Sequence, residues 1–122
     1  SYNSNPLSLN FSIKKFNNIN VNKSKKILIL GDMMELGKFS KKLHVQVSDI
    51  INNSNIDKVH VYGKHIRHTL NKIQTQKKGK IFNNKNEILN FIQNKIDDNN
   101  YLMVKGSNST GLNTIVSKLK SI

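Results

Sequence analysis

Cysteine and tryptophan are absent from this chain of 122 residues, and Pro6 is its single proline. A chain without cysteine forms no disulfide and no thiolate metal site. No apolar run is long enough to cross a bilayer, and residues 1–10 lack the basic and apolar regions of a secretory signal. The length suits one compact domain with a modest core, and we expect that domain to be cytosolic.

Acidic residues and arginine are also scarce. The chain has 7 Asp and Glu against 20 Lys and Arg, which gives a formal net charge of +13. Arg67 is the lone arginine, whereas proteins that read bases and phosphates favour arginine forks. The lysines are spread along the chain and accompany abundant asparagine and isoleucine, and these three residue types share A/T-rich codons. We therefore attribute the charge to codon composition and expect no nucleic-acid partner.

The sequence alternates short apolar runs with amphipathic helical runs. A first helix is expected to have Asn5 as its N-cap and Pro6 at its first helical position. Four strand-and-helix pairs follow. The predicted strands centre on residues 27–30, 59–61, 80–82 and 101–104, and the predicted helices on residues 40–51, 66–73, 84–96 and 112–119. This order predicts a single three-layer α/β domain with a mostly parallel sheet that is covered on both faces.

Local patterns predict which of these elements are buried and where the helices begin. The runs 27–30 and 101–104 are continuous and apolar, as in strands that are buried on both faces. Ser40 is expected to cap the helix that follows it. The buried stripe of that helix is predicted to comprise Leu43, Val47, Ile50 and Ile51. Asn84, with Glu87 three residues later, predicts a capping box at the start of the helix expected at residues 84–96.

Ligands of such folds bind beyond the carboxyl ends of the strands, which singles out the loops 31–39, 63–65 and 105–111. In the first loop, Asp32 and Glu35 follow a buried strand, where carboxylates can accept an ammonium group. The alternative is that Asp32 caps a turn and Glu35 is solvated. His44, at the start of the next helix, could face the same site.

The third loop, residues 105–111, is rich in glycine and hydroxyl side chains, and its backbone N–H groups suit a carboxylate or phosphate. Ordinary N-capping by Ser or Thr explains the loop equally well, and the chain contains no Walker A motif and no G-x-G-x-x-G motif. His65 and His68 share a helical face but lack a third ligand at a useful spacing, so no metal site is expected. No nucleophile–base pair is present, and the domain therefore looks like a binding half, without a complete catalytic set.

Three blocks of the sequence resemble the Mur ligase family, in the same order. Residues 1–6, S-Y-N-S-N-P, are similar to the D-S-Y-N-A-N-P segment that opens the family's C-terminal domain. Residues 27–37, I-L-I-L-G-D-M-M-E-L-G, resemble the L-G-D-M-x-E-L-G block of the branch that adds D-alanyl-D-alanine, and Ser40 and His44 fit the S-x-x-x-H that follows it. Residues 104–107 resemble the closing V-K-G-S block. The G-D-M-x-E-L-G block is specific to this branch, whereas the other two are shared with folylpolyglutamate ligases.

This resemblance implies a Rossmann-like C-terminal domain, spanning residues 1–122, of a three-domain bacterial cytoplasmic ligase of peptidoglycan synthesis. The parent enzyme would bind UDP-MurNAc-tripeptide in its N-terminal domain and ATP with Mg²⁺ in its central domain. It would phosphorylate the tripeptide carboxylate, and the amine of D-Ala-D-Ala would attack the resulting acyl phosphate. The fragment by itself is expected to be inactive and to bind ADP weakly or not at all.

The resemblance also assigns roles by motif position, and it assigns no catalytic residue and no metal ligand to this chain. The residues expected near the nucleotide are Tyr2, Asn3 and Asn5. Those expected on the dipeptide side are Asp32, Glu35 and His44, and those facing the dipeptide carboxylate or the closing interface are Lys105, Gly106, Ser107 and Asn108. The family's Asp before the Ser-Tyr pair, with the strand that carries it, would precede Ser1, and Ser4 replaces the usual Ala.

Two other interpretations stay open from the sequence. The chain could be the C-terminal domain of another Mur or folylpolyglutamate-type amide ligase, against which the G-D-M-x-E-L-G block argues. It could also be a non-catalytic Rossmann-like binding module. A salt-dependent affinity for DNA or RNA that exceeds the affinity for D-Ala-D-Ala would favour the binding module.

Overall fold

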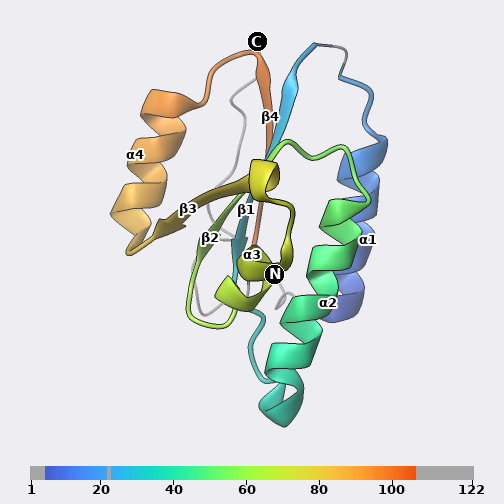
Figure 1. Cartoon of the computed structure of the whole chain (residues 1–122). Coiled ribbons are helices and arrows are strands. Elements are labelled where there is room, and N and C mark those ends of the chain that lie inside the picture. Colours follow the sequence, from blue (N-terminus) through green and yellow to red (C-terminus); the bar gives the residue numbers. More distant parts are fainter. Residues whose placement is uncertain (1–4, 22, 107–122) are drawn as a thin grey trace.

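The computed structural model describes residues 5–21 and 23–106, which form a parallel sheet flanked by helices (Figure 1). Its elements are α1 (Pro6–Asn18), β1 (Lys25–Gly31), η1 (Gly37–Phe39), α2 (Ser40–Asn52), β2 (Lys58–Tyr62), α3 (Arg67–Lys72), η2 (Thr75–Lys77), β3 (Lys78–Phe82), α4 (Lys85–Lys95) and β4 (Asn100–Lys105). The strand order is β3-β2-β1-β4, and every pairing in it is parallel. The predicted α/β fold is therefore confirmed, while the helix predicted at 112–119 lies outside the described residues.

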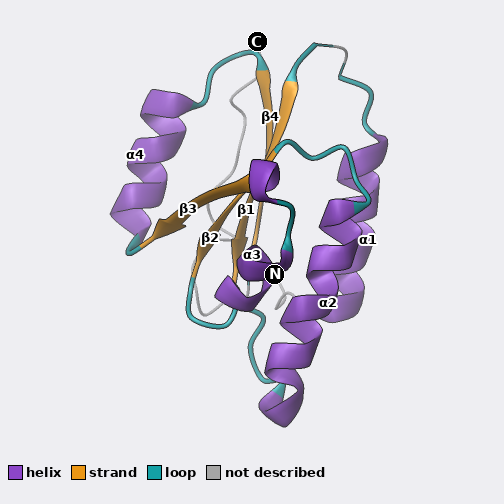
Figure 2. Ribbon diagram, in the orientation of Figure 1, coloured by secondary structure: helices purple, strands orange, loops and turns teal. Residues whose placement is uncertain are grey.

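The helices pack on the two faces of the sheet in unequal numbers. Figures 1 and 2 show α1 and α2 on one side of the sheet and α4 on the other. The larger core cluster joins α1, α2 and α3 to Leu28 and Leu30 of β1. The smaller cluster joins α4 to Ile29, on the opposite face of the same strand. Because successive side chains of a strand point to opposite faces, β1 is buried on both, as its apolar run predicts.

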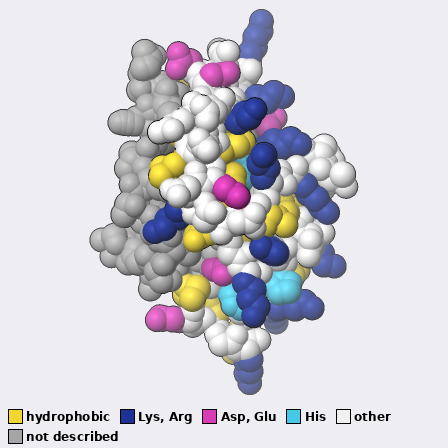
Figure 3. All heavy atoms as spheres, turned by 90° about the vertical axis from the view of Figure 1, so that its left-hand side faces the viewer, with side chains coloured by type: hydrophobic (Ala, Val, Ile, Leu, Met, Phe, Trp, Pro, Cys, Tyr) yellow, Lys and Arg dark blue, Asp and Glu magenta, His cyan; other side chains and the backbone are white. Residues whose placement is uncertain are grey.

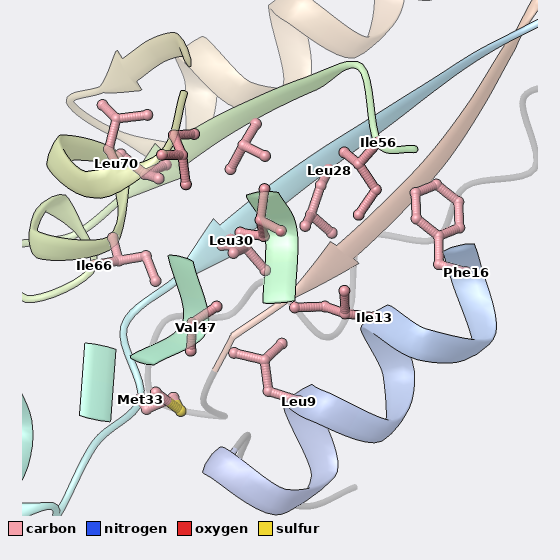
Figure 4. Close-up of a cluster of buried hydrophobic side chains, with 14 residues drawn as sticks. Leu9, Ile13, Phe16, Leu28, Leu30, Met33, Val47, Ile56, Ile66 and Leu70 are labelled. Carbon is pink, nitrogen blue, oxygen red and sulfur yellow. The ribbon is translucent and has the colours of Figure 1, made fainter. Parts of the chain in front are cut away.

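Two predicted helix starts are present. The Asn5 side chain accepts a hydrogen bond from the Ser8 N–H at 2.9 Å, and Ser8 Oγ accepts one from the Asn5 N–H at 3.2 Å, which completes a capping box. At α4, Asn84 caps the Glu87 N–H at 2.9 Å, but the Glu87 carboxylate accepts from the Asn83 N–H instead of the Asn84 N–H. Figure 4 shows the stripe that follows the first cap, in which Leu9, Ile13 and Phe16 point into the core.

The prediction for α2 is wrong in two respects. Ser40 is the first helical residue and Phe39 is the N-cap, without a side-chain cap, because η1 leads directly into the helix and Ser40 already has helical backbone angles. Val47 and Ile51 are buried as predicted, whereas Leu43 and Ile50 are only half-buried. The polar residues His44 and Ser48 complete the buried face in their place.

The burial of two strands, β4 and β1, also departs from expectation. In the described sheet β4 pairs only with β1, and Tyr101 on it is 37 % exposed, so the prediction of a strand buried on both faces is wrong. By contrast Lys26, whose charge favours solvent, is 1 % exposed. Its Nζ donates to the Asn17 carbonyl at 2.7 Å and to Asn55 Oδ1 at 3.0 Å. Burial lowers the pKa of Lys26, and the Asp57 charge partly opposes this.

His60 is a buried polar residue on the α4 face that the sequence pattern did not reveal. Its Nδ1 accepts a hydrogen bond from the Lys80 N–H at 2.8 Å, and its ring lies 4.5 Å from that of Phe91. Gly79 is required beside it, because a Cβ there would come within 2.3 Å of Nδ1. Burial, with the Lys58 and Lys80 charges, lowers the pKa of His60 to about 4.

We expect His60 to make the protein less stable in acid. Unfolded His60 titrates near its ordinary value of 6.5 and folded His60 at about 4. The unfolded state therefore binds more protons in this window, and stability falls as the pH falls. Between ~pH 7.5 and ~pH 4.5 this contribution should be on the order of 2 kcal/mol. Urea denaturation at the two pH values should show a smaller loss for His60→Asn, which keeps an acceptor for the Lys80 N–H but does not titrate. An equal loss in both proteins would contradict the assignment.

Candidate functional site

The carboxyl ends of three strands meet at one edge of the sheet. Gly31, the last residue of β1, pairs with Tyr62 of β2, and Leu30 pairs with Lys105, the last residue of β4. The loops that follow these strands therefore start side by side. The first turn of α2 begins at the same edge, since a helix that connects parallel strands runs antiparallel to them (Figure 2).

Asp32 joins the loops that follow β1 and β2. Its side chain is 8 % exposed and accepts hydrogen bonds from the Lys64 N–H at 3.1 Å and the Ile66 N–H at 2.7 Å. Gly63 lies against it with a φ of +135°, and a Cβ at Gly63 would come within 2.4 Å of Asp32 Oδ1. The sequence left open whether Asp32 binds an ammonium group or caps a turn. In the structure it caps a turn, which belongs to the loop after β2.

His44 holds the beginning of the loop between β1 and α2. The imidazole is fully buried, and its Nε2 accepts a hydrogen bond from the Met33 N–H at 3.0 Å. Its Nδ1 lies 2.8 Å from the Ser40 carbonyl oxygen, which can only accept, so Nδ1 carries the hydrogen. Burial lowers the pKa of His44 and favours this neutral form, although the Ser40 carbonyl and the Asp32 charge act in the opposite direction.

Thr69 completes this arrangement from α3. Its Oγ1 donates a hydrogen bond to the His44 carbonyl oxygen, and its side chain is fully buried. The sequence analysis did not single out Thr69, because a lone Thr in a short helix carries no local signal of burial. Its contact with His44 depends on α2 and α3 lying side by side.

Glu35 is the exposed carboxylate of the site. It lies in the turn after β1 with a φ of +63°, in the left-handed region that residues other than glycine seldom occupy. A pocket of about 210 Å³ opens beside this turn. The residues that line the pocket are Met33, Met34, Glu35, Leu36, Gly37, Ser40 and His65. An accessible carboxylate at the mouth of a small pocket can accept an ammonium group.

The remaining predicted residues fall into three groups. Lys105 ends β4 and Gly106 follows it, at the same edge as Asp32, whereas Asn5 serves as the cap of α1. The first turns of α1 also reach this edge, since Leu9 packs in one cluster with Met33 (Figure 4). The residues that lie outside the described part of the chain are Tyr2, Asn3, Ser107 and Asn108.

The described part of the site provides binding groups but no nucleophile–base pair. Ser40 Oγ lies 3.3 Å from His44 Nδ1, but this nitrogen already carries a hydrogen and so cannot accept the proton of the hydroxyl. The His65 ring centroid is 5.9 Å from that of His44, yet residues 5–21 and 23–106 contain no group of three His, Asp, Glu or Cys side chains that could hold a metal ion.

The sequence model of the family "Mur ligase, glutamate ligase domain" matches residues 1–108. The chain belongs to this family. Among the relatives of this Mur ligase domain is the UDP-N-acetylmuramoyl-tripeptide–D-alanyl-D-alanine ligase of Buchnera aphidicola subsp. Baizongia pistaciae, which is 35% identical over 98% of this chain and 25% of its own length. The Haemophilus influenzae enzyme of the same name is 35% identical over 78% of this chain and 21% of its own length.

Solved structures show the same fold. MurF from Acinetobacter baumannii superposes with a TM-score of 0.77 at 23% identity, over 100% of the Mur ligase domain and 27% of its own chain. The MurF ligase of Thermotoga maritima, solved in complex with ADP, gives 0.75 at 20% identity, over 99% of the domain and 27% of its own chain. The domain thus spans about a quarter of the length of the proteins that it matches.

We expect Gly63 to be far less replaceable than Gly37, the other glycine of the site with a positive φ. At Gly37, with a φ of +58°, a Cβ would meet nothing within 4 Å, so Gly37→Ala should cost about 1 kcal/mol of stability. Gly63→Ala also drives a Cβ into the Asp32 carboxylate and should cost about 3 kcal/mol or more. Urea denaturation of both variants measures the difference, and equal losses would show that Asp32 does not hold the loop after β2.

Proposed function

We propose that this chain is the C-terminal domain of the ATP-dependent ligase that joins D-alanyl-D-alanine to UDP-N-acetylmuramoyl-tripeptide in bacterial peptidoglycan synthesis. The observation that carries the proposal is the location of the block G-D-M-M-E-L-G, residues 31–37. It forms most of the wall of the pocket at the carboxyl edge of the sheet, where an amino substrate can be held. The relatives that bear this enzyme's name support the same assignment.

Within this function, the residues of the edge divide into ligand-binding and supporting groups. Glu35 is suited to the ammonium of the dipeptide, and Lys105 with Gly106 to its carboxylate. Asp32 and His44 keep the two loops in place. Held in this way, the dipeptide ammonium loses one proton to solvent, and the amine attacks the carbonyl carbon of the tripeptide acyl phosphate. The C–N bond forms, phosphate leaves with the electrons of the C–O bond, and the nitrogen releases a second proton to solvent to give the amide. The contribution of the domain to catalysis is orientation and the exclusion of water.

ATP and Mg²⁺ do not fit the described residues as resident ligands. The chain has no Walker A motif, and residues 5–21 and 23–106 contain no cluster that could hold a metal ion. We therefore derive no step through either group from this chain. Both belong to the other domains of the proposed enzyme, and Tyr2, Asn3 and Asn5 are proposed to approach the nucleotide when the domains close.

On the face seen from the α4 side, Lys and Arg side chains stand among acidic and neutral ones (Figure 3). Proteins that follow a phosphate backbone gather their positive charge on one face or in one groove. No helix of the described residues is both long and apolar enough to cross a membrane.

The proposed function predicts a specific amino substrate. The ligase that contains this domain should release phosphate from ATP when UDP-N-acetylmuramoyl-tripeptide and D-Ala-D-Ala are both present. With glutamate in place of the dipeptide, kcat/KM should fall by at least about 100-fold, because neither carboxylate of glutamate lies as many bonds from the amine as the carboxylate of the dipeptide does. Phosphate release and mass spectrometry of the product measure this. Equal use of glutamate would assign the chain to another amide ligase of the family.

Substitution of Glu35 should change KM for the dipeptide and leave KM for ATP unchanged. Glu35→Gln removes the charge that faces the ammonium and should raise KM for D-Ala-D-Ala about 10-fold, with KM for ATP unchanged. Glu87→Gln is the matched control, because Glu87 is the only other glutamate of the chain and lies on α4, away from the pocket. Steady-state kinetics should separate the two variants. A similar KM in both would remove Glu35 from the binding site.

A further inference from the structure

The loop that carries Glu35 is held by a hydrogen bond from the backbone N–H of Met33 to the side chain of His44. Met33 is 1 % exposed, and its N–H donates to His44 Nε2 at 3.0 Å. A buried N–H that loses its acceptor costs about 1–3 kcal/mol. Two residues later, Glu35 occupies a left-handed backbone conformation, which persists only where the surrounding structure holds it.

We propose that His44 is a positioning residue: its neutral imidazole fixes the Met33 N–H and thereby the turn that presents Glu35 to the amino substrate. The inference rests on the proposed function for the identity of that substrate. The hydrogen bond itself is a property of the fold and can be tested without any ligand.

The imidazole of His44 offers a donor and an acceptor at the same time. Its Nδ1–H donates to the Ser40 carbonyl, four residues back along α2, and this fixes the tautomer that leaves Nε2 as an acceptor. The His44 backbone is held in turn by Thr69 Oγ1 from α3. Asp32, the neighbour of Met33, binds the Ile66 N–H just before α3. The positions of α2, α3 and the loop after β1 are therefore coupled.

Protonation of His44 would turn Nε2 from an acceptor into a donor. A hydrogen on Nε2 would face the Met33 N–H, and two donors cannot form this bond. The ionisable groups around His44 are Asp32, which favours the charged ring, and His65 and His68, which oppose it. Burial lowers the pKa of His44, so the neutral ring is maintained at neutral pH and is lost as the pH falls through that pKa.

The test uses the full-length ligase and three variants. His44→Gln keeps an oxygen acceptor at the reach of Nε2, His44→Leu removes it, and His68→Gln is the matched control on α3. Hydrogen exchange of the Met33 amide reports the bond directly, and ¹⁵N NMR of wild type reports the tautomer. KM for D-Ala-D-Ala, KM for ATP and kcat are measured as functions of pH.

We expect slow exchange at Met33 in wild type, His44→Gln and His68→Gln, and exchange at least 10-fold faster in His44→Leu. In His44→Leu, KM for the dipeptide should rise about 10-fold or more with KM for ATP unchanged, and His44→Gln should stay within about threefold of wild type. In acid, KM for the dipeptide should rise in wild type and in His68→Gln. It should not rise in His44→Gln.

Several results would overturn the proposal. One is a hydrogen on Nε2 in the wild-type spectrum, which needs no variant and therefore decides the matter even if His44→Leu does not fold. Another is unchanged Met33 exchange in a folded His44→Leu. A third is a KM for the dipeptide in His44→Gln as high as in His44→Leu while Met33 stays protected. If wild type does not use D-Ala-D-Ala at all, the proposed function fails, whereas the exchange and tautomer measurements still decide the role of His44.

Discussion

The site depends on one buried carboxylate that bridges two loops. Asp32 follows the central strand β1 and accepts the N–H groups of Lys64 and Ile66, which follow β2. Charge-assisted hydrogen bonds of this kind are about twice as strong as neutral ones, and they satisfy two backbone donors at the entrance to α3. The close approach leaves no room for a side chain at Gly63. The pocket beside Glu35 is lined from both loops, by residues 33–37 after β1 and by His65 after β2, and the Asp32 bridge joins these two loops.

Two buried histidines, on opposite faces of the sheet, also accept hydrogen bonds from backbone N–H groups. His44 accepts the Met33 N–H on the face that α1, α2 and α3 cover, and His60 accepts the Lys80 N–H on the face that α4 covers. Each ring must be neutral to accept, and burial lowers both pKa values. We therefore expect acid to act on the domain at two places. Protonation of His60 removes the acceptor of the Lys80 N–H in β3, and protonation of His44 removes that of the Met33 N–H in the loop of the site.

A binding surface without a complete catalytic set is consistent with a domain that spans about a quarter of the relatives it matches. An amide ligase has to bring an amine and an activated carboxylate together with water excluded, and separate domains that close on each other can do this. Under the proposed function, Glu35 orients the amine, which requires the turn that carries it to be fixed. The hydrogen bonds of Asp32, His44 and Thr69 join the segments next to this turn.

The sequence by itself determined the elements, the parallel order and the family. Apolar periodicity and capping residues act over a few positions, so α1, β1 and the cap at Asn84 could be read locally, and the block 31–37 marked the loop of the site. Only the tertiary structure decided the partners of the polar groups. The sequence did not predict the burial of Lys26 and His60, the partial burial of β4 or the displacement of the α2 cap from Ser40 to Phe39. Nor did it predict the contact of Thr69 with His44. The physical reason is that a buried polar side chain is stabilised by hydrogen-bond partners that are distant in sequence, as Lys64 and Ile66 are from Asp32, and no local pattern records which segments the fold brings together.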